Sequence, residues 1–334
     1  MKPIIGITIG DPAGIGPEIV CKTLLDREIY HICRPVLIGS SSVINRVLAT
    51  LNIDLKVQSV IDPRNTVFEY GLINIIDIPL DYDYSPGELK TGNGKSALEY
   101  IYKSVELIKN GLIDAISTAP TNKEAMKMAG STHAGATELF AHLANVKEFS
   151  TIIKQGKCYI FQLTTHISLR DAINKINKEF LYNEIKKAND ELILLGLKRP
   201  KIGLSGLNPH AGEGGLLGNE EIEIFEPVVR RLKSEGIDIS DPLPADSIFF
   251  RGYNGTFDAI IMMYHDAANI AIKLMSNSMP TVVITGGLPF VRTTVAHGTA
   301  YDIAYKGIAD YQQMKQAIVA ASEIFQRKTH MEGD

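Results

Sequence analysis

Cysteine is scarce in this chain of 334 residues: it holds three, Cys21, Cys33 and Cys158, and none forms a CxxC pair. So small and odd a number argues against both a disulfide framework and a zinc site made of cysteines. The sequence also has no apolar run near the ~18 residues that a membrane-spanning helix needs. Its start lacks the basic region, apolar region and cleavage site of a signal peptide. We therefore expect a cytoplasmic protein with no membrane partner.

An excess of charge of either sign is missing as well. Lysine and arginine total 34 and aspartate and glutamate 38, which leaves a net charge of −4, and no long basic run occurs. A nucleic-acid-binding protein would present a basic patch, so we expect no nucleic-acid partner. An anionic substrate must then be held by a few local cations.

What the sequence does contain is a regular alternation of short Val- and Ile-rich runs with longer amphipathic segments. The predicted strands are Pro3–Ile9, Pro35–Ile38, Ile73–Ile78, Asp114–Thr118, Thr151–Ile153, Tyr159–Leu163, Lys201–Leu204, Ala259–Met263 and Thr281–Thr285. The predicted helices include Lys95–Lys109, Lys178–Leu195, Glu220–Glu235 and Gln312–Gln326. Because the short runs are almost continuously apolar, the strands are expected to be buried on both faces. This order predicts an α/β protein with a mainly parallel sheet, and the length suggests two domains.

Two glycine-rich segments resemble ligand loops. The segment Gly10–Glu18 lies between a predicted strand and a helix, but Ile19 stands at the third position after Gly16, so it is no GxGxxG fingerprint. A structural turn and a ligand loop both remain open for it. The segment Gly92–Ser96 imitates half of a P-loop, but Leu89 stands where a glycine is required, which argues against a kinase.

Three histidines occupy the same kind of position, just beyond the carboxyl end of a predicted buried strand. They are His166, His210 and His265. Open α/β sheets bind their ligands at this edge. Three imidazoles with one open position suit a catalytic divalent metal such as zinc. The pattern therefore predicts a metal site, against the alternative that each histidine is a hydrogen-bonded core residue.

The last third of the chain holds further candidates. One is the run His297, Gly298, Thr299 and Ala300. Its glycine could admit a flat ring or a phosphate close to backbone N–H groups, although an ordinary helix cap explains it equally well. Lys273 and Arg292 flank the strand predicted at 281–285, and together they suit a phosphate or carboxylate.

Seven segments, in order, resemble the 4-hydroxythreonine-4-phosphate dehydrogenase family of vitamin B6 biosynthesis, including its D-threonate and D-erythronate 4-phosphate branch. They are GDPAGIGPE from Gly10, STAPTNKEA from Ser117, GLNPHAGEGG from Gly206, PLPADSIF from Pro242, MYHD from Met263, GLPFVRT from Gly287 and HGTA from His297. The family is similar to isocitrate and isopropylmalate dehydrogenases, which bind NAD(P) without a Rossmann fingerprint. The resemblance implies a two-domain α/β/α fold with the active site in the interdomain cleft. It places residues 1–130 and 281–334 in a cofactor domain, and residues 131–280 in a domain with the metal ligands and the dimer interface.

The resemblance also implies roles for the candidates near the metal. His166, His210 and His265 would bind one divalent ion per site (Zn, Mg, Mn or Co), and a homodimer would complete each active site. Asp246 or Asp266 would accept a proton or support a metal ligand, and the sequence does not choose between them.

Substrate and cofactor residues follow from the same resemblance. Thr137, Lys273 and Arg292 fall where the family contacts its substrate. The segment His297–Ala300 falls where the related dehydrogenases hold the adenine end of NAD or NADP.

The sequence departs from the family pattern at five positions. Ala136 replaces a histidine and Val283 an asparagine, both at substrate contacts. Ala267 and Ala268 replace Gln-Gly, and Ala296 replaces an aspartate. Two substrate contacts are therefore lost while all three histidines remain.

On this resemblance we expect NAD(P)-dependent, metal-assisted oxidation of 4-hydroxythreonine 4-phosphate at its 3-hydroxyl, followed by decarboxylation to 3-amino-2-oxopropyl phosphate. D-threonate or D-erythronate 4-phosphate is the alternative, since Ser117–Ala125 is slightly closer to that branch. Another hydroxy acid is a further alternative because of Ala136 and Val283. From another class, a non-catalytic protein that binds a phosphorylated metabolite would also explain the lost contacts, but the three retained histidines favour an enzyme.

Overall fold

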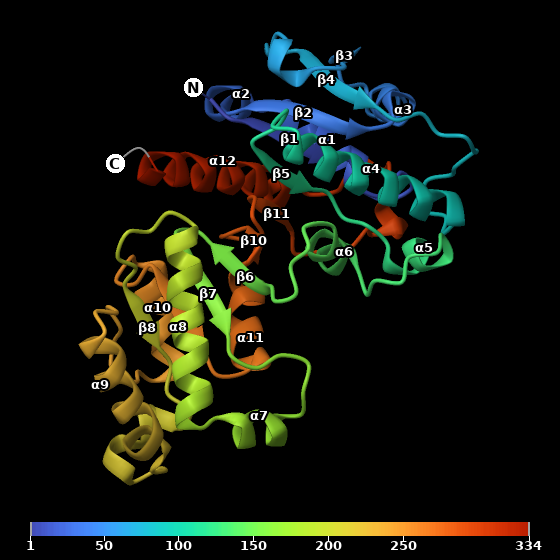
Figure 1. Ribbon diagram of the computed structural model, residues 1–334. Coiled ribbons are helices and arrows are strands. Elements are labelled where there is room, and N and C mark those ends of the chain that lie inside the picture. The colour runs from blue at the N-terminus through green and yellow to red at the C-terminus, as the bar shows by residue number, and fades with distance from the viewer. Residues whose placement is uncertain (1, 333–334) are drawn as a thin grey trace. The chain divides into compact units, whose positions relative to one another are not determined.

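The structure, a computed structural model, describes residues 2–332 and contains two compact units, each built from separate stretches of the chain (Figure 1). One unit comprises residues 2–150 together with Val282–Gln326, and the other comprises Thr151–Thr281 together with residues 327–332. The opening stretch of the first unit ends at residue 150, whereas the resemblance placed this boundary at residue 130. The assignment of cofactor and metal to separate domains stays a prediction.

A mainly parallel sheet forms the centre of the first unit. Its strands lie in the order β3-β4-β2-β1-β5-β11-β10, and every described pairing among them is parallel except β10 with β11. The strands are β1 (Ile4–Thr8), β2 (Arg34–Gly39), β3 (Lys56–Ser59), β4 (Leu72–Asp77), β5 (Ala115–Thr118), β10 (Thr281–Gly286) and β11 (Arg292–Val295). The central strands β1 and β2 are almost wholly buried, which explains their unbroken apolar sequences.

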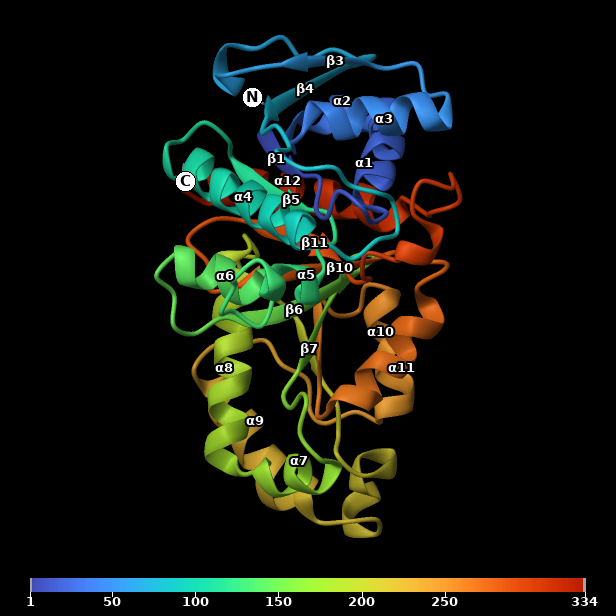
Figure 2. The ribbon, with the colours of Figure 1, turned by 90° about the vertical axis from the view of Figure 1, so that its right-hand side faces the viewer.

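Helices cover this sheet, and Figure 2 shows them from a second side. They are α1 (Gly16–Leu24), α2 (Arg27–Ile32), α3 (Ser41–Leu51), α4 (Thr91–Lys109), α5 (Lys123–Met128), α6 (Ala136–Leu143) and α12 (Gln312–Glu332), with short 3-10 turns at Pro63–Asn65 and Tyr301–Ile303. Helix α4 packs against β1, β2 and β5. Helix α12 is joined to β11 by a hydrogen bond of 2.8 Å from Thr293 Oγ1 to the carbonyl of Ala317.

The strands of the second unit lie in the order β6-β7-β9-β8. Its elements are β6 (Ser150–Gln155), β7 (Cys158–Gln162), α7 (Leu169–Lys175), α8 (Lys178–Leu194), β8 (Ile202–Leu204), the turn η2 (Pro209–Gly215), the π-helix η3 (Glu221–Phe225), α9 (Glu226–Ser234), α10 (Ala245–Tyr253), β9 (Ala259–Met262) and α11 (His265–Met275). Strands β7, β9 and β8 are parallel, whereas β6 and β7 form an antiparallel hairpin. The core here includes Ile160, Ile260 and Ala268, which are fully buried.

The α/β class and all nine predicted strands are confirmed. The sequence did not predict β3 or β11. Strand β3 is a largely exposed Lys-Val-Gln-Ser edge strand. Strand β11 reads Arg-Thr-Thr-Val and carries its polar side chains into the interior, so neither strand has the apolar run of a buried strand. In the described part of the chain, no helix is long and apolar enough to cross a membrane, and the three cysteines are buried free thiols.

Candidate active site

The most unusual side chain of the first unit is Arg292, the first residue of β11, which is 2% exposed. Its guanidinium donates to the hydroxyls of Thr137 and Thr285, each at 3.0 Å, and to that of Thr118 at 2.9 Å. Nε has no hydrogen-bond partner, and no carboxylate of residues 2–332 forms an ion pair with this arginine. The ring of Phe140 lies 4.9 Å from the guanidinium carbon and supplies a cation–π contact.

Burial lowers the pKa of Arg292 to about 10, and Glu138 opposes that shift only in part. A buried cation costs several kcal/mol unless a counter-charge and hydrogen bonds compensate for its lost hydration. Here hydroxyls supply the hydrogen bonds, but no counter-charge is in contact. This group of residues is therefore suited to bind an anion.

The three threonines reach Arg292 from separate elements. Thr118 ends β5, Thr285 lies in β10, and Thr137 is in the first turn of α6. Helix α6 has no side-chain cap at its N-terminus, so its first N–H groups add to the positive potential near Thr137. The predicted substrate residues Thr137 and Arg292 are therefore in direct contact.

Both departures at substrate positions border this group. Ala136 is the first residue of α6 and precedes Thr137. Val283 is two residues before Thr285 in β10, and side chains two apart in a strand share one face. The residues that differ from the family pattern are thus placed around the arginine that is retained.

In the second unit, two of the three predicted metal ligands come together. His166 follows β7 and His265 follows β9, and because those strands are parallel neighbours their ends coincide. The two imidazole rings lie 5.6 Å apart between centroids. His166 has a left-handed backbone, with φ of 55°. A non-glycine residue in that conformation is strained, and such strain is found most often at functional sites.

His210, the third predicted ligand, is not assembled with this pair. It lies in the turn η2, its side chain is 66% exposed, and its Nδ1 is 3.2 Å from Glu213 Oε2. Within residues 2–332, no three His, Cys, Asp or Glu side chains are arranged to hold a metal ion. The donor chemistry of the His166–His265 pair fits a divalent metal, while the site with all three histidines stays a prediction.

The His210 loop itself is held by a residue that the sequence reasoning missed. The carboxylate of Glu221 is 4% exposed and accepts hydrogen bonds from the backbone N–H of Leu207 (2.7 Å) and of Asn208 (2.8 Å). It also accepts from the Asn208 amide at 2.8 Å. Glu221 begins the π-helix η3, and π-helical turns are frequent at functional sites. Nothing in the run of glutamates around residue 221 distinguishes the buried one.

Three more predicted residues lie on the surface of the second unit. Lys273 is exposed in the last turn of α11, and the carbonyl before it, that of Ile272, accepts a 2.9 Å hydrogen bond from Gln155 Nε2. Asp246 is exposed in the first turn of α10. Asp266 is exposed beside His265, whose Nδ1 lies 3.2 Å from Asp266 Oδ1. Of the two carboxylates, Asp266 is the one in contact with a predicted metal ligand.

The run from His297 to Ala300 ends at the N-cap of the 3-10 turn Tyr301–Ile303, and no side chain caps that turn. Gly298 is exposed, with open space where a Cβ would be, and Ala300 has a left-handed φ of 41°. The carbonyl of Thr299 accepts a 2.9 Å hydrogen bond from the N–H of Ile15. The strand-to-helix turn Gly10–Glu18 therefore packs directly against this run.

The other three departures from the family pattern are Ala267, Ala268 and Ala296. Ala268 is fully buried in the core of the second unit, and Ala267 packs at its edge. Ala296 is exposed, and its N–H donates to Gln313 Oε1 at 3.0 Å.

Comparisons with known proteins identify the family of this chain. The family model of the pyridoxal phosphate biosynthetic protein PdxA matches residues 31–321. A protein of Oceanobacillus iheyensis, provisionally named a D-threonate 4-phosphate dehydrogenase, is 43% identical over 97% of this chain and 98% of its own. The solved 4-hydroxythreonine-4-phosphate dehydrogenase of Burkholderia phymatum is 40% identical, with a TM-score of 0.83 over 97% of this chain and 98% of its own. The solved 4-hydroxythreonine-4-phosphate dehydrogenase of Klebsiella pneumoniae is 37% identical, with a TM-score of 0.85 over 97% of this chain and 100% of its own. The chain therefore belongs to the family of the pyridoxal phosphate biosynthetic protein PdxA, and it is a dehydrogenase.

Proposed function

We propose that this dehydrogenase uses NAD or NADP to oxidise the 3-hydroxyl of 4-hydroxythreonine 4-phosphate, whose 3-keto product loses CO₂ to give 3-amino-2-oxopropyl phosphate. The observation that carries the proposal is Arg292, a buried guanidinium with no carboxylate in contact. A doubly anionic substrate supplies the missing counter-charge. This choice of substrate is supported by the solved 4-hydroxythreonine-4-phosphate dehydrogenases, which are similar to this chain over 97% of its length.

The threonines around Arg292 suit the binding of an anion. A hydroxyl has one proton to donate and two lone pairs that accept. Thr137 and Thr285 accept from the guanidinium, so each keeps its own proton for a ligand oxygen. Arginine and two hydroxyls together would bind a phosphate or carboxylate through several charge-assisted hydrogen bonds.

The second unit would supply the metal-dependent part of the chemistry. His166 and His265 would hold a divalent ion, with His210 as the proposed third ligand. Such an ion, when bound, acts as a Lewis acid on the substrate oxygens. Asp266 or Asp246 would accept the hydroxyl proton, and the hydride would pass to the nicotinamide ring. Lys273 would bind the second anionic end of the substrate.

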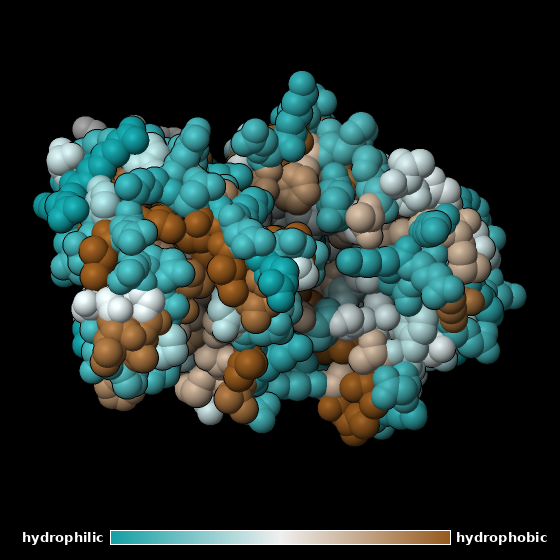
Figure 3. All heavy atoms as spheres, turned by 90° about the horizontal axis from the view of Figure 1, so that it is seen from below, coloured by the Kyte–Doolittle hydropathy of each residue, from teal (hydrophilic) through white to brown (hydrophobic). Residues whose placement is uncertain are grey.

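We further propose a homodimer that completes each active site. Large apolar side chains are exposed on the second unit: on α11, Ile270 is 62% and Leu274 77% exposed, and Leu216, after η2, is 77% exposed. Residues four apart share one face of a helix, so Ile270 and Leu274 form a single apolar stripe beside Lys273. Figure 3 shows one face of the molecule on which brown apolar areas lie among hydrophilic ones. Exposed apolar area of this kind is typical of an interface with another protein chain.

D-threonate 4-phosphate is the second candidate substrate. It carries a hydroxyl where 4-hydroxythreonine 4-phosphate carries an amino group, so both present the same phosphate, carboxylate and 3-hydroxyl. It is favoured by relatives that are 40–43% identical over 95–97% of this chain and provisionally named for that substrate.

A substrate panel tests the proposal. Purified protein loaded with zinc or manganese is mixed with NAD or NADP and each of 4-hydroxythreonine 4-phosphate, D-threonate 4-phosphate and D-erythronate 4-phosphate. We expect metal-dependent formation of the reduced cofactor with the first, at the highest kcat/KM, and its loss in His210→Ala. Faster turnover of D-threonate 4-phosphate would establish the second candidate instead. No reduction with any of the three would contradict both.

A further inference from the structure

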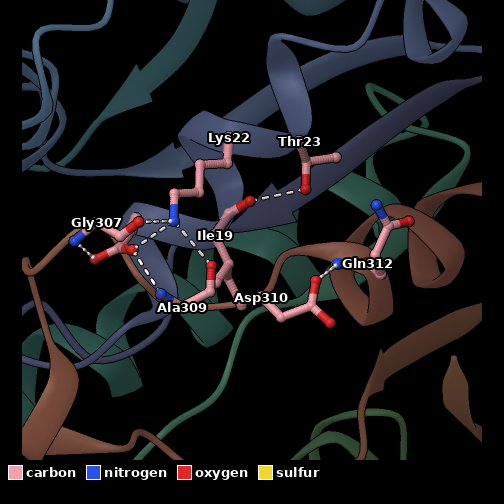
Figure 4. A network of polar contacts seen from close by, with 8 residues as sticks. Ile19, Lys22, Thr23, Gly307, Ala309, Asp310 and Gln312 are labelled. Atoms are coloured by element: carbon pink, nitrogen blue, oxygen red, sulfur yellow. Dashed lines mark hydrogen bonds and ion pairs between the residues drawn. The ribbon is translucent and has the colours of Figure 1, made fainter. Parts of the chain in front are cut away.

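An ion pair between a buried glutamate and a partly exposed lysine holds the backbone that follows the His297–Ala300 run (Figure 4). Glu18, in α1, is fully buried, and its carboxylate is 2.8 Å from the ammonium of Lys22. The same carboxylate accepts from the N–H of Ala309 at 3.0 Å and from that of Gly307 at 3.3 Å. The Lys22 ammonium donates to the carbonyls of Gly307 and Ala309, at 2.7 and 2.9 Å. This ion pair therefore binds the N–H groups and the carbonyl groups of both Gly307 and Ala309.

A second buried carboxylate holds the other end of the same segment. Asp11 accepts a 2.6 Å hydrogen bond from the hydroxyl of Tyr301 and a 2.8 Å bond from the N–H of Ala13. The hydroxyl of Tyr305 donates to the carbonyl of Pro12 at 2.8 Å. Burial raises the pKa of Asp11 and of Tyr301, as expected for polar groups removed from water.

The segment held in this way has a strained backbone. Ala300 and Tyr305 both have left-handed conformations, with φ of 41° and 61°. Such a conformation is strained in a non-glycine residue and persists only where the surroundings impose it. The contacts around these two residues impose that conformation. They are made by Asp11, Tyr301, Glu18 and the Ile15–Thr299 hydrogen bond.

We propose that Asp11 and Glu18 are positioning residues for the dinucleotide: they hold residues 299–309 in the shape that presents the His297–Ala300 run to the cofactor. Neither carboxylate touches the cofactor, since both are buried beneath the segment that they hold. This inference rests on the proposed function, in which that run binds the adenine end. It assigns the Gly10–Glu18 turn to support of the cofactor site and not to direct ligand binding.

The energetics favour this role over simple stabilisation. An ion pair with one partly exposed partner contributes little net stability, so the Glu18–Lys22 pair is weak evidence for a purely stabilising role. What the pair supplies is a fixed geometry for the backbone of Gly307 and Ala309. A ligand pays less for ordering when its binding segment is already fixed, so loss of the pair should appear in cofactor affinity.

The test measures cofactor binding and catalysis separately in two variants. Glu18→Gln keeps the size of the side chain but removes its charge, and Tyr301→Phe removes the hydroxyl held by Asp11. Asp114→Asn is the matched control: this carboxylate is 12% exposed, pairs with Arg64 and accepts from the N–H of Ile4 at the amino ends of β1 and β5. Dissociation constants for NAD and NADP come from titration calorimetry of the metal-free protein, and KM and kcat from cofactor reduction.

We expect both variants to weaken dinucleotide binding and raise its KM about tenfold, with kcat and the KM of the substrate within twofold of the native protein. The control should bind the dinucleotide as the native protein does. Tyr301→Phe leaves both carboxylates in place, so it tests the inference even if Glu18→Gln does not fold. Native dinucleotide affinity in a folded Glu18→Gln and in Tyr301→Phe would overturn the inference alone. Absence of dinucleotide binding by the native protein would overturn the proposed function and this inference with it.

Discussion

The guanidinium of Arg292 donates a 3.0 Å hydrogen bond to the hydroxyl of Thr137, a residue 155 positions earlier in the chain. The contact joins the first turn of α6 to the start of β11, and both partners are candidate substrate residues. This arginine is 2% exposed, and its described hydrogen bonds go to hydroxyls and not to a carboxylate. Buried groups with a shifted pKa cluster at functional sites, which supports a binding role for Arg292.

Substitution by alanine should affect stability at Gly14 but not at Gly298. A Cβ on Gly14 would lie 2.9 Å from Thr299 Cβ and 3.0 Å from the Thr299 carbonyl oxygen, whereas a Cβ on Gly298 would meet nothing within 4 Å. We expect Gly14→Ala to lower the free energy of unfolding by about 1–3 kcal/mol through overpacking. Gly298→Ala should leave stability unchanged and raise the KM of the dinucleotide. Denaturant unfolding and steady-state kinetics measure the two; a destabilised Gly298→Ala would contradict the open space described for it.

Glu221 should be needed for the His210 loop. Glu221→Gln replaces a buried acceptor of three hydrogen bonds by an amide that cannot accept them all. We expect it to lower stability by about 1–3 kcal/mol and to weaken zinc binding. The exposed neighbour Glu223, two residues further on, offers the matched control in Glu223→Gln. Equal melting temperatures and zinc affinities for the two variants would show that Glu221 does not organise the loop.

The raised pKa of Asp11 predicts a pH dependence of stability. Burial raises this pKa above its ordinary value of 3.8, so between 3.8 and the folded-state value the native protein holds a proton that the unfolded chain has released. The resulting stability is fully present below pH 3.8 and is lost as the pH rises through the folded-state pKa. The native protein should therefore lose stability relative to Asp11→Asn as the pH rises above 3.8. Denaturant unfolding at several pH values measures this difference, and a difference independent of pH would refute it.

Removal of the metal should abolish turnover, and removal of one histidine should weaken metal binding. We expect His166→Ala and His265→Ala each to raise the dissociation constant for zinc at least about tenfold, since each removes a ligand. His133 and His142 offer a control, because their rings are even closer, at 4.7 Å, but lie in the first unit. His142→Ala should bind zinc as the native protein does. Zinc affinity unchanged in His265→Ala would exclude the His166–His265 pair as a metal site.

The fold was largely predictable from the sequence, because buried parallel strands carry nearly continuous apolar runs. The same logic placed His166 and His265 together, since both follow strands that proved to be parallel neighbours. It could not place β11, whose polar Arg-Thr-Thr sequence conceals a buried strand.

The surroundings of Arg292 were beyond local sequence patterns. Its three threonine partners come from β5, α6 and β10, and only the tertiary structure brings them to one point. The burial of Glu221, one of several neighbouring glutamates, likewise depends on the tertiary structure. The left-handed backbone at Ala211 was likewise not predictable, because alanine rarely adopts it.

The most direct test of the central claim is the kcat/KM of Arg292→Lys for 4-hydroxythreonine 4-phosphate, measured by cofactor reduction beside the native protein. Lysine keeps the positive charge, but it lacks the planar fork of donors with which arginine can bond three hydroxyls and an anion at once. We predict a loss of about a hundredfold or more, equivalent to about 2.7 kcal/mol of transition-state stabilisation, in a variant that remains folded. Native kcat/KM in that variant would show that the buried guanidinium does not bind the substrate, and would contradict the account.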